Sequence, residues 1–246
     1  MLHEPKKISI QPQEFLELFK KHLRYSVIFE KEFNFDEIKK NREDSINRIL
    51  TGQTTYNDSL FSYYRSSSIW TTFISNCFDN YGVSVIDRVL IEFALARRIN
   101  LFNPGISHEY YRVDNMLYRR IELSDEEKIV LKPFEEHFWK PVICVEHENS
   151  WKSWTDELVK LIGIDCELRV VISYSHDVVH SLKVANFVAK KVCGLYENSR
   201  VKGEILLIFG KRIPRNGTLS DEEIVDGFQA YKYDFDTECF TSINLT

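Results

Sequence analysis

The feature that most constrains the fold is an apolar run from Pro141 to Val145, followed by two glutamates one residue apart, Glu146 and Glu148. A short apolar run of this kind predicts a buried strand. Because side chains alternate along a strand, both glutamates are expected to leave the same face. Two like charges at the rim of a buried strand are costly unless a cation lies between them, and a divalent metal ion with oxygen ligands would serve.

The neighbouring segments place further polar groups in a defined order. Residues 110–118 are aromatic and apolar, predict a strand and contain a third carboxylate, Asp114. Residues 151–162 have apolar side chains at helical spacing and carry Lys160, and residues 168–174 predict another strand. The expected order is therefore a strand with Asp114, a strand with Glu146 and Glu148, a helix with Lys160, and a strand.

This order and these residues resemble the PD-(D/E)xK nuclease superfamily over residues 109–209. The resemblance implies an α/β fold of the restriction-endonuclease-like type, with a mixed central sheet flanked by helices. It also implies that Asp114 and Glu146 bind Mg²⁺ or Mn²⁺. In the family, a lysine two residues after the second acid orients or deprotonates the attacking water.

The chain departs from the family pattern at that lysine, since Glu148 occupies its position. A glutamate there is a known variant of the family, and the resemblance then makes Glu148 a third metal ligand or a base acting on the water. Lys160 is the candidate for a lysine that has migrated to the following helix. Lys152 is a weaker candidate because it lies in the connecting turn.

The pattern along the chain changes near Asn103-Pro104-Gly105. Before it, apolar stripes at helical spacing predict helices over residues 13–25, 35–50 and 84–99. After it, strand-like runs alternate with helices, including a long helix over 176–196 and strands over 204–209 and 228–233. We therefore expect a mainly helical N-terminal region, 1–103, and a nuclease-like domain, 104–246, which could still share one core.

Composition excludes some classes of function. Only 9 glycines occur and no glycine-rich phosphate loop is found, which argues against Walker and Rossmann types of nucleotide site. The formal net charge of -5 argues against a broadly basic nucleic-acid surface but permits a local basic groove. The 5 cysteines form no Cys-x-x-Cys pair, and no apolar stretch reaches the roughly 18 residues of a membrane span. We expect a soluble cytoplasmic protein with reduced thiols and no membrane partner.

Each candidate site residue also has a structural interpretation. Asp114 could end or bend a strand, the two glutamates could point to water, and Lys160 could pair with Asp156 on a solvated helix face. His147 is expected on the opposite strand face, in the core. His176 and His180 have a spacing that could bind a metal, but a surface or capping role is favoured.

The sequence as a whole favours a metal-dependent nuclease that acts on DNA, with Asp114, Glu146 and Glu148 as metal ligands and Lys160 as the catalytic cation. One alternative is a catalytically silent member of the same fold that binds nucleic acid or a protein partner. Another is an unrelated α/β enzyme in which these acids are structural.

Overall fold

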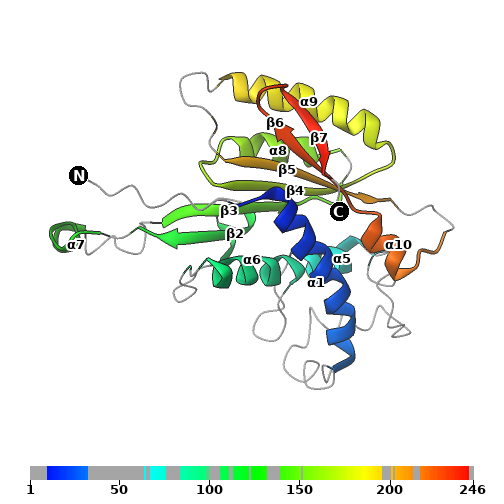
Figure 1. Ribbon diagram of the computed structural model, residues 1–246, viewed down its shortest axis with the longest axis horizontal. Coiled ribbons are helices and arrows are strands. Elements are labelled where there is room, and N and C mark those ends of the chain that lie inside the picture. Colours follow the sequence, from blue (N-terminus) through cyan, green and yellow to red (C-terminus); the bar gives the residue numbers. More distant parts are fainter. Residues whose placement is uncertain are drawn as a thin grey trace.

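A computed structural model of the chain describes residues 10–32, 64, 67–75, 84–97, 99, 106–110, 113–121, 123–131, 139–150, 152–195, 201, 203–212 and 217–243. Within these residues seven strands form one sheet, whose spatial order is the order of the chain (Figure 1). The strands are β1 (Ile106–Tyr110), β2 (Val113–Arg120), β3 (Trp139–His147), β4 (Leu168–Ser175), β5 (Glu204–Lys211), β6 (Gln229–Asp234) and β7 (Cys239–Ile243).

The sheet is mixed. Its central strands β3, β4 and β5 are parallel, and every other neighbouring pair is antiparallel. The parallel strands are joined by α8 (Trp154–Ile162) and α9 (Val178–Leu195), which pack on the same face of the sheet. β4 is buried from Leu168 to Tyr174, as expected for a central parallel strand covered on both faces. The predicted α/β class with a mixed central sheet is confirmed.

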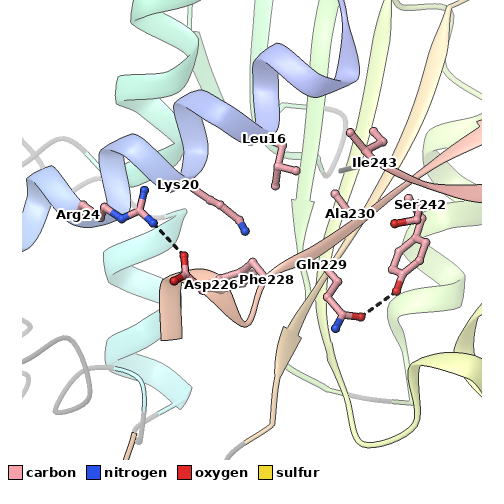
Figure 2. Close-up of a pocket in the computed structure, with 10 residues that line it drawn as sticks. Leu16, Lys20, Arg24, Asp226, Phe228, Gln229, Ala230, Ser242 and Ile243 are labelled. Carbon is pink, nitrogen blue, oxygen red and sulfur yellow. Dashed lines mark hydrogen bonds and ion pairs between the residues drawn. The ribbon is translucent and has the colours of Figure 1, made fainter. Parts of the chain in front are cut away.

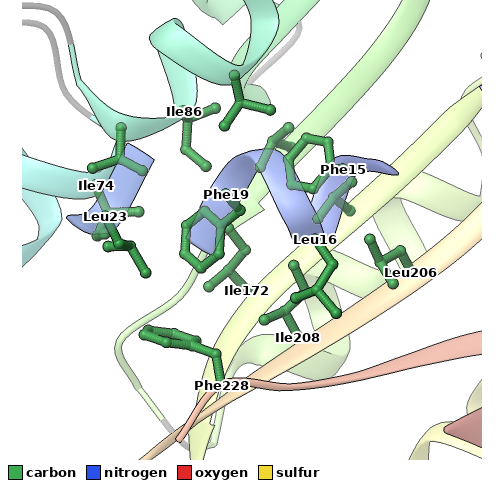
Figure 3. Packing of buried hydrophobic residues seen from close by; sticks show 14 of the residues in the cluster. Phe15, Leu16, Phe19, Leu23, Ile74, Ile86, Ile172, Leu206, Ile208 and Phe228 are labelled. Carbon is green, nitrogen blue, oxygen red and sulfur yellow. The ribbon is translucent and has the colours of Figure 1, made fainter. Parts of the chain in front are cut away.

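The opposite face of the sheet is covered by α1 (Pro12–Glu32), α5 (Ser67–Ile74), α6 (Val85–Ala96) and α10 (Asp221–Asp226). Phe15, Leu16 and Phe19 of α1 belong to one buried cluster with Ile172 and Ile208 of the sheet (Figure 3). A further short helix, α7 (Asp125–Leu131), lies between β2 and β3 in sequence and projects away from the sheet in Figure 1. The helices predicted over 13–25 and 84–99 thus correspond to α1 and α6.

Polar side chains fix where two of these helices begin. Ser84 accepts a hydrogen bond from the backbone N–H of Asp87, whose carboxylate accepts one from the backbone N–H of Ser84. Ser220 and Glu223 form the same reciprocal arrangement at the start of α10. Each arrangement satisfies backbone donors that the first helical turn leaves unpaired.

The helix predicted over residues 35–50 and the boundary expected near residue 104 lie outside the described residues. The described parts on either side of that boundary share one hydrophobic cluster, which contains Phe93 of α6 and Leu206 of β5. Among the helices that the structure describes, none combines the length and apolar character needed to cross a membrane.

Candidate active site

Strand pairing brings Asp114 and Glu146 together at the carboxyl end of β3. Asn115 lies opposite Val145 in the antiparallel β2–β3 pair, so the residues next to them, Asp114 and Glu146, are neighbours on the other face of the sheet. The backbone N–H of His147 donates to Oδ2 of Asp114, with an N···O distance of 2.8 Å. This hydrogen bond fixes the Asp114 carboxylate beside the strand that carries Glu146.

The helix that follows β3 adds a cation to these acids. α8 packs on the sheet through Trp154, Leu158, Leu161 and Ile162, which are buried. Lys160 lies between Leu158 and Leu161 in the sequence of α8. Its Nζ is 2.5 Å from Oε1 of Glu146. The same ammonium contacts Oε2 of Glu157, one turn earlier on α8. We call Asp114, Glu146, Glu157 and Lys160 the Glu146 cluster.

Burial and like charge dominate the chemistry of Glu146, which is only 2% exposed. Burial, followed by the nearby charge of Asp114, raises the pKa of Glu146 from 4.5 to about 9, although Lys160 acts in the opposite direction. In the absence of another cation, Glu146 therefore holds a proton at neutral pH.

Lys160 remains a cation within this cluster. Burial alone would lower the pKa of Lys160, but its contacts with Glu146 and Glu157 outweigh that effect and raise the pKa. Because Asp114, Glu146 and Glu157 outnumber Lys160, the cluster has a net negative charge when its members are all ionised.

Three of the four residues predicted for the site meet in this cluster: Asp114, Glu146 and Lys160. Glu157 was not predicted as a site residue, although its spacing of three residues from Lys160 on a helix was the signal that could have identified it. Asp156, the partner that the structural interpretation gave to Lys160, is exposed instead.

Glu148 lies in a different environment from the residues of the Glu146 cluster. β3 ends at His147, and the carboxylate of Glu148 accepts a hydrogen bond from the backbone N–H of Ser150, with an N···O distance of 2.6 Å. Glu148 is not among the charges that chiefly set the pKa of Glu146. Within the described residues, no group of three or more His, Cys, Asp or Glu side chains is arranged to hold a metal ion.

His147 lies on the face opposite Glu146, in the core. Its Nε2 is 2.8 Å from the hydroxyl of Tyr174, which in turn accepts a hydrogen bond from the indole N–H of Trp70. Burial lowers the pKa of His147 to about 3, so the imidazole is neutral at physiological pH. His147 therefore connects the strand that carries Glu146 to the α5 side of the sheet.

A separate pocket of about 840 Å³ lies on the α1 side of the sheet and contains no member of the Glu146 cluster. The ammonium of Lys20 points into it, and Arg24 pairs with Asp226 at its rim (Figure 2). Burial lowers the pKa of Lys20, and the charge of Asp226 opposes this shift. The pocket belongs to the packing between α1, α10 and the β6–β7 pair.

Comparisons of this chain with models of protein families, with curated proteins and with solved structures found no match.

Proposed function

We propose that this chain is a metal-dependent nuclease of the restriction-endonuclease-like type that hydrolyses phosphodiester bonds in DNA. The observation that carries the proposal is the convergence of Asp114, Glu146 and Lys160 at the carboxyl end of β3. Two acids on adjacent strands and a lysine on the next helix are the groups that the resemblance assigns to the reaction.

The order of elements around the cluster supports the same proposal. β1, β2 and β3 form an antiparallel meander, α8 follows, and β4 returns parallel to β3. This arrangement places the carboxyl end of β3 beside the residues that connect it to α8. A phosphodiester could therefore be held between the acids on the sheet and Lys160 on the helix.

Two carboxylates of the cluster, Asp114 and Glu146, are the proposed ligands of a divalent cation. Oε1 of Glu146 is buried and lies 2.5 Å from the ammonium of Lys160. Asp114 and Glu146 would hold Mg²⁺ or Mn²⁺, which when bound would polarise the phosphodiester and lower the pKa of a coordinated water. Glu146 must lose its proton to act as a ligand, since a metal binds the carboxylate and not the carboxylic acid.

The remaining residues of the cluster have roles that follow from their contacts. The N–H of His147 orients Asp114 by binding one of its oxygens. Lys160 would place a fixed positive charge near the scissile phosphate, where negative charge develops in the transition state. Glu157 holds the Lys160 ammonium beside Glu146 and so acts as a positioning residue.

A second candidate function is a catalytically silent protein of the same fold that binds nucleic acid. Lys160 contacts both Glu146 and Glu157, so its ammonium is already held by acids of this chain. A silent protein would keep these contacts as structural ion pairs and would have no need of a metal ion.

Purified protein, incubated with single-stranded and duplex DNA and with RNA, distinguishes the two functions. We expect cleavage with Mg²⁺ or Mn²⁺ and none with EDTA. Glu146→Ala should abolish cleavage, and Lys160→Ala should reduce the rate by a factor on the order of 10² or more, as the loss of a transition-state electrostatic contact does.

Asp156→Ala is the matched control, because Asp156 is an exposed carboxylate on the same helix as Lys160. It should leave the rate unchanged. Cleavage by Glu146→Ala at the rate of the wild type would assign the activity to another site or a contaminant, and absence of cleavage under every condition would favour the silent protein.

A further inference from the structure

α9 stands out by its charge in a chain whose net charge is -5. Its sequence, Val178–Leu195, contains Lys183, Lys190 and Lys191 and a histidine, but no aspartate or glutamate. The chain as a whole has more acidic than basic residues, 37 against 32. A helix of this length without an acid therefore gives one part of the surface a local positive charge.

The basic residues of α9 gather on its outer side. Ala185 and Ala189 are buried against the sheet, with Leu182, Val188 and Val192 packed beside them. The exposed residues His180, Lys183, Phe187 and Lys191 follow one another at intervals of three or four and so share the opposite side of the helix. We call these four residues the α9 ridge. Figure 1 shows α9 as an outer layer over the sheet.

The charges of the α9 ridge are available to a partner. Lys183 and Lys191 form no ion pair with any residue in the described part of the chain, whereas Lys190, next to the ridge, is paired with Glu238. The ring of Phe187 is 65% exposed, and Nζ of Lys191 lies 5.9 Å from its centroid. An exposed aromatic ring between two lysines can stack on a base while the lysines contact phosphates.

The α9 ridge begins near the carboxyl ends of the parallel strands, where the Glu146 cluster also lies. β3 and β4 are parallel, with His147 opposite Ile172, and α9 starts shortly after β4 ends at Ser175. From there the helix runs away from the carboxyl ends of these strands. His180 to Lys191 cover about 16 Å along the helix axis, at 1.5 Å per residue.

A membrane is a poorer partner for this surface. An interfacial helix inserts a free apolar face into the lipid. The apolar face of α9 is instead buried against the sheet, and the exposed Val179, Phe187 and Leu195 are separated along the helix.

We propose that the α9 ridge binds a single-stranded nucleic acid, with Lys183 and Lys191 on its phosphates and Phe187 stacked on a base. The proposal rests on the proposed nuclease function, because the ridge would guide the strand toward the Glu146 cluster. The proposal also specifies the substrate as single-stranded, because a base can stack on Phe187 only when it is not paired in a duplex.

Fluorescence anisotropy with a labelled 20-nucleotide oligo-dT, in EDTA so that no cleavage occurs, tests the ridge. We expect Lys183→Glu/Lys191→Glu to weaken binding at least tenfold and to reduce the slope of log K against log salt by about one to two, as the loss of two phosphate contacts predicts. Phe187→Ala should weaken binding without changing that slope. It should also reduce the preference for oligo-dT over a duplex of the same length.

Arg24→Glu/Lys128→Glu is the matched control, because it makes the same change in net charge on α1 and α7. This control should bind like the wild type. An equal loss of binding in the control, or wild-type affinity in the ridge variant, would overturn the proposal. Binding to phosphatidylserine vesicles but not to oligo-dT would also overturn it.

The same variants separate the ridge from the proposed reaction. Cleavage that depends on Glu146, together with oligo-dT binding that is unaffected in the ridge variant, rejects the ridge alone. Oligo-dT binding that depends on the ridge, without any metal-dependent cleavage, supports the ridge and rejects the nuclease.

Discussion

At the scale of single residues, Glu146 is the most informative position because its environment opposes its charge. It is buried, faces Asp114 and Glu157, and has Lys160 as the cation in contact with it. If a buried carboxylate had only a structural role, we would expect a cation to balance its charge, or an apolar residue in its place. The excess of acids at this position is the electrostatic basis for expecting a metal ligand.

The raised pKa of Glu146 predicts how the metal-free protein responds to pH. A carboxyl group whose pKa rises from 4.5 to about 9 on folding contributes fully to stability below pH 4.5, and this contribution is lost as pH rises toward 9. Because glutamine cannot ionise, we expect Glu146→Gln to match the wild type near pH 4.5 and to be more stable by about 1 to 3 kcal/mol at pH 8. Urea unfolding in EDTA measures this difference.

Glu17→Gln, at an exposed position on α1, controls for the removal of a carboxylate. A difference between Glu146→Gln and the wild type that stays constant from pH 4.5 to 8 would contradict the raised pKa.

Glu148 offers a test that separates metal binding from a local turn. Its carboxylate accepts from the N–H of Ser150, and the amide oxygen of a glutamine can accept the same hydrogen bond. We therefore expect Glu148→Gln to change the Mg²⁺ concentration for half-maximal cleavage by less than about twofold, well under 1 kcal/mol. An increase of tenfold or more in that concentration would instead establish Glu148 as a ligand.

At the scale of elements, the sequence was most informative where an apolar pattern ran without interruption. The segments 168–174 and 204–209 were predicted as strands and lie within β4 and β5, and the long helix predicted over 176–196 is α9. Strand parity and this element order were also enough to predict that Asp114, Glu146 and Lys160 lie close together. Local pattern fixes these elements because each buries a continuous apolar face.

The edges of the sheet were harder to predict. Residues 110–118 were expected as one strand, but the chain forms β1 and β2 as an antiparallel pair, and β7 was not predicted. β7 pairs with β6, so the strand predicted over 228–233 is not the last one of the sheet. Exposed edge strands need little apolar pattern, since their pairing comes from backbone hydrogen bonds. Glu157 was missed for a similar reason, because its role depends on α8 packing over β3.

Asn115 connects β2, the strand that carries Asp114, to the helices α5 and α6. Asn115, next to Asp114, is fully buried, and its amide donates to the carbonyl of Ser75 at 2.8 Å and to Oδ1 of Asp87 at 3.3 Å. Asn115 thus attaches β2 to the end of α5 and to the first turn of α6.

Removing this attachment should cost stability without touching the Glu146 cluster. We expect Asn115→Ala to lower the free energy of unfolding by about 1 to 3 kcal/mol, because it leaves buried polar groups without their partner. The Mg²⁺ dependence of cleavage should not change below the melting temperature. Denaturant unfolding gives the first quantity, and a variant as stable as the wild type would contradict the role of Asn115.

At the scale of the whole molecule, the N-terminal helices and the sheet share one hydrophobic core. The shared cluster contains Phe15 and Phe19 of α1 together with Ile172 and Ile208 of the sheet (Figure 3). Phe93 of α6 belongs to the same cluster. These helices cover the face opposite α8 and α9. The carboxyl end of β3 thus lies in a sheet that is packed on both faces, which gives the Glu146 cluster a rigid support.

This shared core predicts that residues 104–246 do not fold alone. Burying a large apolar side chain contributes about 1.5 to 3 kcal/mol, so Phe15, Leu16, Phe19 and Leu23 of α1 together contribute on the order of 6 to 12 kcal/mol. That sum is comparable with the whole stability of a typical domain, about 5 to 15 kcal/mol. We expect the fragment to aggregate or to bind a hydrophobic dye, because Ile172 and Ile208 would lose their cover.

Co-expression of 1–103 with 104–246 provides the control, since the missing helices can then pack on the sheet in trans. A soluble complex of the two fragments with a cooperative unfolding transition is the expected result, measured by gel filtration and circular dichroism. A monomeric 104–246 fragment that unfolds cooperatively by itself would show two independent domains. In that case the N-terminal helices would be an accessory layer, and the residues that carry the proposed reaction would need only the sheet, α8 and α9 for their support.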